Sequence, residues 1–179
     1  MQTQNNSQDT VTSSKTGRNM AIIAWVIGML LLTRLFGIWE DNQRNPNQAL
    51  PTTSETADEI TIALERNRYG HYVFDGDING HTVTFMIDTG ATDVVVPQAV
   101  ADKIGLKSYG RAQASTANGI ITVFNTSLKR VSIGPITLYN VPASINPAMN
   151  SEDYVLMGMS ALKHLELRQK NTTLTLIQH

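Results

Sequence analysis

From Glu59 to the C-terminus the chain repeatedly alternates apolar with polar residues, and this pattern restricts its fold more than any other feature. Ile60, Ile62 and Leu64 occupy every second position, as expected of a half-buried strand. Two further apolar runs, His71 to Ile78 and His81 to Ile87, are separated by Asn79-Gly80. Because this dipeptide is typical of two-residue hairpins, we expect the two runs to pair as antiparallel strands.

The remaining part of this region continues with short strands and turn signals. Val94 to Val96 predicts another strand, and Pro97 opens a short helix from Gln98 to Ile104, because proline suits a helix start. The alternation returns in Thr172 to Ile177, and turn or helix-end signals lie between these elements at Gly105, Asn118-Gly119 and Gly134-Pro135. Residues 59–179 are therefore predicted to form a mainly β domain, a small closed and mostly antiparallel barrel with one or two short helices.

The N-terminal part divides into three pieces by composition. Residues 1–19 are rich in Gln, Asn, Ser and Thr and predict a disordered tail. Residues 20–39, Met20 to Trp39, are apolar except for Thr33 and Arg34, and a helix of this length reaches about 30 Å, one hydrocarbon thickness. Residues 40–58 are polar and contain prolines, so we interpret them as a flexible stalk that spans roughly 25 Å.

The apolar segment has two interpretations. A transmembrane anchor is favoured, because Arg34 lies near the end of the segment, where its charged group can reach the membrane interface. The alternative is a cleaved signal peptide with Ala21 to Leu32 as its apolar core, but no small-x-small cleavage site follows. Lys15 and Arg18 precede the segment and slightly favour a cytoplasmic N-terminus.

Composition argues against several classes of function. The formal net charge is −1, which provides no electrostatic reason to expect nucleic acid as a partner. The chain has no cysteine, so disulfides, thiol catalysis and thiolate metal sites are excluded. The four histidines are scattered without ligand spacing. We therefore expect no metal site.

The tripeptide Asp88-Thr89-Gly90 occurs once and follows the apolar run Val83 to Ile87. A water molecule can be activated for peptide hydrolysis by two close carboxyls that share one proton, because like charges at that separation cannot both ionise. Gly90 permits the close approach of two such loops, and Thr89 can anchor its loop through its hydroxyl group. With one copy per chain, the second carboxyl must come from a second molecule. A plain surface turn is the simpler interpretation of the tripeptide alone.

Two motifs together resemble the retroviral-type aspartic proteases, the retropepsins. Asp88-Thr89-Gly90-Ala91 matches their active-site quartet, and Val155 to Leu162 resembles their strand, glycine and short-helix element. The chain is most similar to the bacterial, membrane-anchored members. The resemblance implies a retropepsin-type barrel, a homodimer, a polypeptide substrate and no cofactor. It departs at Thr92 and Met159, where retroviral enzymes usually carry an Asp and an Arg that pair.

The resemblance also implies roles for three other parts of the chain. Retropepsins cover the bound peptide with a mobile hairpin, and the hairpin around Ala114 to Ile121 lies at the matching place, although an ordinary surface hairpin is the alternative. Thr172 to Ile177 corresponds to the terminal strand that retropepsins interleave with a partner. The expected substrate-binding and flap residues are Val95, Ala117, Asn118, Gly119, Ile120 and Leu156.

The sequence therefore supports the hypothesis of an aspartic endopeptidase with one catalytic Asp88 per protomer. It would be anchored in a bacterial inner membrane by a single span, Met20 to Trp39, with the enzymatic domain in the periplasm. The alternative is a catalytically silent domain of the same fold that binds peptides or only dimerises. The natural substrate does not follow from the sequence.

Overall fold

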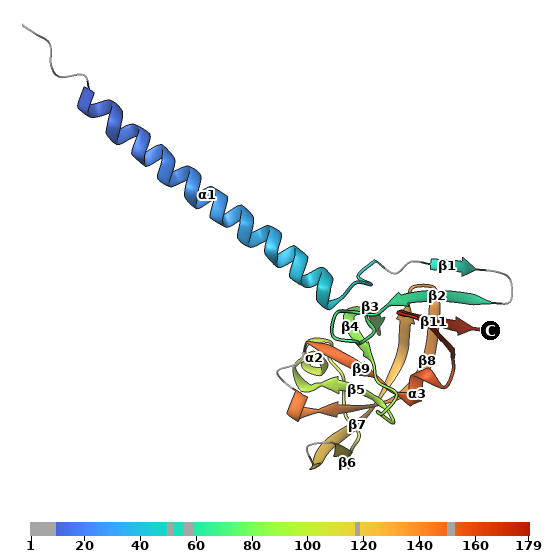
Figure 1. Ribbon diagram of the computed structural model, residues 1–179. Helices are drawn as coiled ribbons and strands as arrows, with labels where there is room; N and C mark the ends of the chain where they lie inside the picture. Colours follow the sequence, from blue (N-terminus) through green and yellow to red (C-terminus); the bar gives the residue numbers. More distant parts are fainter. Residues whose placement is uncertain (1–9, 50–51, 56–58, 117–118, 150–152) are drawn as a thin grey trace, which may run out of the picture. The chain divides into compact units, whose positions relative to one another are not determined.

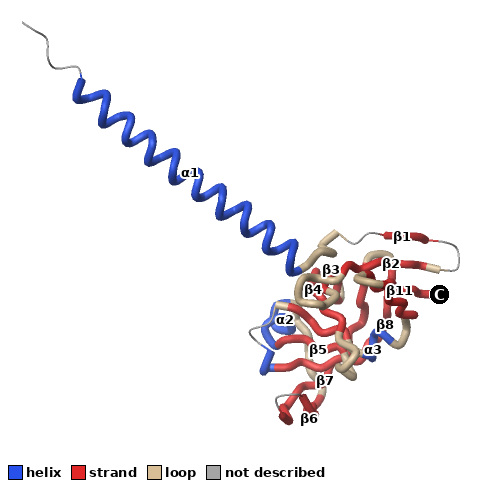
Figure 2. The backbone as a smooth tube through the Cα atoms, viewed as in Figure 1, coloured by secondary structure: helices blue, strands red, loops and turns tan. Residues whose placement is uncertain are grey.

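The computed structural model of the protein describes residues 10–49, 52–55, 59–116, 119–149 and 153–179 (Figure 1). The chain divides into two compact units, Met1–Asp41 and Asn42–His179. The first contains most of the long helix α1, and the second consists mainly of strands and the loops between them (Figure 2).

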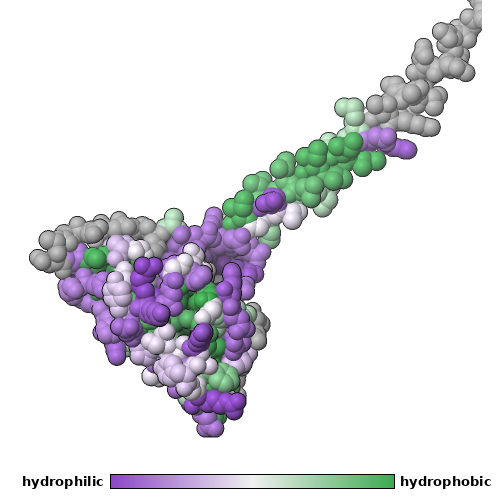
Figure 3. All heavy atoms as spheres, turned by 180° about the vertical axis from the view of Figure 1, so that it is seen from behind, coloured by the Kyte–Doolittle hydropathy of each residue, from purple (hydrophilic) through white to green (hydrophobic). Residues whose placement is uncertain are grey.

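Helix α1 (Thr10–Arg44) is longer than the predicted span at both ends. It includes residues 10–19, which we expected to be disordered, because the polar residues before the apolar segment contain no proline that would end a helix. It ends at Arg44 because Asn45 precedes Pro46, and a residue before proline disfavours helical geometry. Gly17–Arg44 is long and apolar enough to cross a membrane, and none of its most apolar part is buried against the rest of the chain (Figure 3).

Six strands of the second unit close into a barrel. Their order is β3 (Val73–Ile78), β4 (His81–Ile87), β9 (Tyr154–Met157), β5 (Val94–Pro97), β8 (Ile136–Asn146) and β7 (Gly119–Ile133). A pairing between β7 and β3 closes the ring, and β6 (Gly110–Thr116) pairs with β7 outside it. The predicted closed β-barrel is confirmed, although β4–β9 and β5–β8 are parallel pairs.

Predicted local elements appear at their expected places. The hairpin between β3 and β4 turns at Asn79 and Gly80, whose φ angles are 54° and 92°. Helix α2 (Gln98–Lys103) follows β5, and the chain leaves it through Gly105 with a φ of 68°. The stacked rings of Phe74 and Phe85, with centroids 5.5 Å apart, lie in the core of the barrel.

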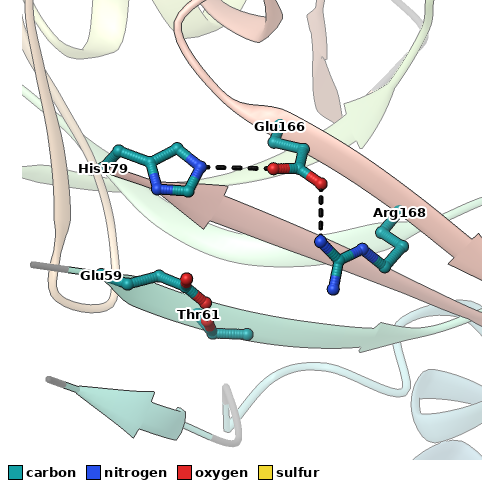
Figure 4. Close-up of polar contacts among 5 residues, drawn as sticks. All are labelled: Glu59, Thr61, Glu166, Arg168 and His179. Carbon is teal, nitrogen blue, oxygen red and sulfur yellow. Dashed lines mark hydrogen bonds and ion pairs between the residues drawn. The ribbon is translucent and has the colours of Figure 1, made fainter.

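A second sheet has the order β1 (Thr52–Glu55), β2 (Ile60–Glu65), β11 (Thr173–Gln178) and β10 (Glu166–Lys170). Both edges of β11 are paired within the chain, which differs from the interleaving with a partner that the resemblance implies. On β10, Glu166 accepts hydrogen bonds from Arg168 at 2.7 Å and from His179 at 3.2 Å (Figure 4). The Arg168 bond and then the His179 bond hold the pKa of Glu166 below its ordinary value.

The segment after α1, which we expected to be a free stalk, is partly built into the domain. Asn47 is only 1% exposed. Its side-chain amide donates to the carbonyl oxygens of Glu65 at 2.9 Å and Val73 at 2.8 Å, and its side-chain oxygen accepts from the Glu65 amide. Asn45 donates to Asp75 at 2.9 Å. Because a buried asparagine must satisfy its polar atoms, this segment, Asn45 to Asn47, docks where backbone groups of β2 and β3 pair with the Asn47 side chain. We call it the strap.

Candidate active site

The Asp88 loop connects β4 to β5 and passes over the end of β9, which lies between these two strands. The amide of Asp88 donates to the carbonyl oxygen of Met157 at 3.2 Å, which fixes the start of the loop to β9. The amide of Ala91 donates to the Asp88 carbonyl oxygen at 3.2 Å, and the amide of Gly90 donates to the Asp88 carboxylate at 2.9 Å. The carboxylate is therefore held at a defined place on a tight turn.

The loop lies at the protein surface. Asp88 and Ala91 are half-buried, whereas Thr89 and Gly90 are exposed. The glycine of the strand-glycine-helix element lies directly beneath them: a Cβ atom on Gly158 would be 2.7 Å from the Ala91 carbonyl oxygen and closer still to that of Asp93. Only glycine allows the two backbones to approach this closely.

Helix α3 (Met159–Leu162) supports the loop from below. The amide of Met159 donates to the carbonyl oxygen of Ala91, and the amide of Ser160 donates to that of Thr92, both at 2.8 Å. Thr92 and Met159, the positions that depart from the retroviral ion pair, thus lie on segments joined by backbone hydrogen bonds. These bonds brace the loop within a single chain.

Ser160, which is 5% exposed, also supports the loop and was not among the residues predicted from the sequence. Its hydroxyl oxygen accepts a hydrogen bond from the Val94 amide at 3.0 Å and donates one to the Pro142 carbonyl oxygen at 2.7 Å. It therefore joins α3 to the end of the Asp88 loop and to β8. The only signal for Ser160 in the sequence is its position two residues after Gly158, within the strand-glycine-helix element.

The predicted pocket residues Val95 and Leu156 lie opposite each other across β5 and β9. Both are half-buried, while their neighbours Val94, Val96, Val155 and Met157 are in the core. Because strand side chains alternate between faces, Val95 and Leu156 lie on the face that points away from the barrel interior. Met86 of β4 is paired with Leu156 and extends this apolar row.

The predicted flap corresponds to the hairpin of β6 and β7. Gly119 has a φ of 112° and pairs with Thr116, whose hydroxyl group donates to the Gly119 carbonyl oxygen at 2.8 Å. Ile120 is 73% exposed. Ala117 and Asn118, which we also assigned to the flap, lie outside the described residues. Within the described part of the chain, no cluster of three or more His, Asp or Glu residues could hold a metal ion.

An Asp-Thr-Gly loop over a strand-glycine-helix element in a closed barrel defines the aspartic-protease class of retropepsin type. The gag-polyprotein putative aspartyl protease family matches residues 74–164, and the chain belongs to this family. The match includes the Asp88 loop, the β6–β7 hairpin and helix α3.

A solved structure and two proteins are similar to this chain. The crystal structure of a retropepsin-like aspartic protease from Rickettsia conorii matches with a TM-score of 0.57 and 29% identity, covering 68% of this chain and 92% of that one. An uncharacterized protein in the cobV 5′ region of Sinorhizobium sp. is 33% identical over 68% of this chain and 52% of its own. An uncharacterized protein from Rickettsia prowazekii is 29% identical over 59% of this chain and 46% of its own. The chain thus spans about half the length of these two relatives.

Proposed function

We propose that the protein is a membrane-anchored aspartic endopeptidase whose active site forms between two copies of the chain. The observation that carries this proposal is a single, surface-exposed Asp-Thr-Gly loop that presents one carboxylate. Hydrolysis by this class of chemistry needs two carboxyls. A second Asp88 supplies the missing group, and the exposed Thr89 and Gly90 are free to meet their counterparts in the partner.

In the dimer the two Asp88 carboxyls share one proton across the loops. The ionised carboxylate takes a proton from the bound water as the water attacks the peptide carbonyl carbon, and the protonated carboxyl donates its proton to the carbonyl oxygen. The carboxylates alone activate the water, so the reaction uses no cofactor. The loop donates a hydrogen bond to Met157 and accepts hydrogen bonds from Met159 and Ser160, and these bonds preorganise its geometry before substrate arrives.

The substrate is a polypeptide in an extended conformation. The half-buried row of Met86, Leu156 and Val95 offers apolar contacts to its side chains. The β6–β7 hairpin closes over it, and the exposed Ile120 near its tip contacts the peptide or the partner's flap once the site is occupied. This explains an apolar side chain of that size at an exposed position.

Helix α1 anchors the enzyme in a bacterial inner membrane through Met20 to Trp39, with the enzymatic unit in the periplasm. The support is the length and apolar composition of the helix, together with the two basic residues that precede it. A signal peptide has the same two properties. Mass determination of the N-terminus of the membrane-bound protein separates the two.

Mixing of wild-type protein with Asp88→Asn protein tests the shared active site. One mutant protomer removes a carboxyl that both chains need, so with free exchange of protomers activity should fall as the square of the wild-type fraction. Asp102→Asn is the matched control, because Asp102 is an exposed carboxylate on α2, and mixtures with it should keep full activity. A linear fall with Asp88→Asn would mean that each chain works alone and would refute the homodimeric site.

A second function, a silent domain that binds peptides or only dimerises, is the alternative because the retroviral ion pair is absent at Thr92 and Met159. The intact Asp88-Thr89-Gly90 argues against it, because a silent domain has no chemical need for the carboxylate. Cleavage of a denatured test protein at acidic pH, with and without a statine-type inhibitor, decides between the two. Inhibitor-sensitive cleavage that is lost in Asp88→Asn supports the enzyme. Peptide binding without cleavage by the wild type supports the silent domain.

A further inference from the structure

The turn between β2 and β3 exposes two arginines and an aromatic ring. We call residues 66–71 (Arg-Asn-Arg-Tyr-Gly-His) the basic loop. Arg66 and Arg68 are exposed and Tyr69 is 56% exposed. The Arg68 guanidinium carbon lies 4.7 Å from the centre of the Tyr69 ring. The basic loop itself contains no carboxylate that could pair with its arginines. The nearest carboxylate in the sequence, Glu65, accepts a hydrogen bond from Thr173 at 2.9 Å.

Asn67 holds the basic loop in a fixed shape. Its side-chain oxygen accepts hydrogen bonds from the amides of Tyr69 and His71, both at 2.9 Å. The backbone of Asn67 donates to His71 and accepts from Gly70, whose φ is 91°. The two arginines and the tyrosine are therefore presented without the entropy cost of ordering a free loop.

The basic loop is also tied to the last residue of the long helix. The side-chain amide of Asn67 donates to the Arg44 carbonyl oxygen at 2.9 Å. Arg44 follows Trp39, the last residue of the apolar stretch, within the same helix, so about 7.5 Å of helix separates them. The connection through the chain alone therefore keeps the basic loop close to the surface of any bilayer that contains the apolar stretch of α1.

We propose that the basic loop binds the headgroups of anionic lipids in the bilayer that holds α1. Guanidinium groups bind phosphodiester oxygens in a two-pronged geometry, and tyrosine is enriched at membrane interfaces. Each arginine at an anionic surface favours contact by about fivefold. Glu40 and Asp41 lie just before Arg44, and their negative charges oppose this attraction. The end of the helix therefore provides no net positive charge, and the attraction to anionic lipids comes from Arg66 and Arg68 of the basic loop. The proposal rests on the anchor in the proposed function and not on the protease chemistry.

The experiment uses the full chain in nanodiscs. Because the protein has no cysteine, His71→Cys provides a single site for a fluorophore, and Gln113→Cys on the exposed β6 strand, at the other end of the domain (Figure 1), provides the control site. The readout is quenching by lipids with a nitroxide on the headgroup, in phosphatidylglycerol and in phosphatidylcholine discs. Arg66→Glu/Arg68→Glu is compared with Lys107→Glu/Lys129→Glu, which changes the charge equally at exposed positions elsewhere.

Quenching at position 71 should be stronger in phosphatidylglycerol than in phosphatidylcholine, and the loop double variant alone should abolish the difference. Equal quenching in both lipids, or equal loss in both double variants, would overturn the proposal. If quenching at position 71 changes with the number of protein copies per nanodisc and not with the lipid charge, the loop contacts a second copy of the chain and the proposal is overturned. A chain that fails to insert into nanodiscs would refute the anchor and the loop contact together, whereas loss of protease activity would affect neither.

Discussion

Replacement of Ser160 by alanine tests whether the Asp88 loop depends on the hydroxyl bridge below it. The variant removes the hydrogen bond from the Val94 amide at 3.0 Å and the bond to the Pro142 carbonyl oxygen at 2.7 Å. Val94 is fully buried, so its amide is left without a partner, at a cost of about 1–3 kcal/mol. Pro142 is an exposed residue, and its carbonyl loses about 1 kcal/mol at most.

The free energy of unfolding should therefore fall by about 1–4 kcal/mol, which lowers Tm by roughly 5–15 °C in a domain of this size. Both tryptophans, Trp25 and Trp39, are in α1, so unfolding of the barrel should be followed by far-UV circular dichroism in detergent. Below the transition, kcat should fall by about tenfold or more, because a shifted loop misaligns the reacting groups.

Ser127→Ala is the matched control for this prediction. Ser127 is exposed on β7, and its replacement should change stability by less than about 0.5 kcal/mol. A Ser160→Ala protein as stable and as active as the control would refute the argument that this bridge supports the site. A loss of stability with unchanged kcat would mean that Ser160 supports the fold alone.

Three further predictions follow from the same structure. Gly158→Ala should abolish activity and strongly destabilise the domain, because the new Cβ atom would collide with carbonyl groups of the Asp88 loop. Gly110→Ala is the control and should be active, because its Cβ atom has no contact closer than 3.8 Å. Equal activity of the two variants would contradict the close approach at Gly158. Asn47→Ala should cost about 2–4 kcal/mol in urea unfolding, since it leaves backbone groups of Glu65 and Val73 without their side-chain partner. Replacement of the exposed Gln48 by alanine should be neutral, and equal stabilities of the two variants would show that the strap contributes nothing. The dependence of kcat/KM on pH should be bell-shaped with a maximum below neutrality, because the carboxyl pair works with one proton, and a rate that rises steadily through pH 8 would rule out this mechanism.

Features set by short-range chemistry could be predicted from the sequence. Asn79-Gly80 forms the predicted hairpin, because both residues accept the positive φ angles that the turn requires. The strand, glycine and helix of residues 154–162 were predicted from an apolar run that ends at Gly158. Each of these elements depends mainly on residues that are neighbours in the chain.

Features that depend on distant partners could not be predicted. Period-two alternation does not determine strand direction, so the parallel pairing of β4 with β9 was not anticipated. Asn47 resembles any polar loop residue until its backbone partners on β2 and β3 are known. Likewise, Ser160 gains its importance from Val94 and Pro142, which are remote in sequence.

The docked strap changes how two such domains can meet. A free stalk up to Asp58 would let each domain search a volume, but the strap leaves only the end of α1, between Trp39 and Asn45, as a tether, about 9 Å of helix. With α1 in a bilayer, as proposed, encounters between two copies would take place in two dimensions between neighbouring anchors. The rate at which shared sites assemble would follow the number of chains per area of membrane, so crowding in the membrane plane would control how much enzyme is active.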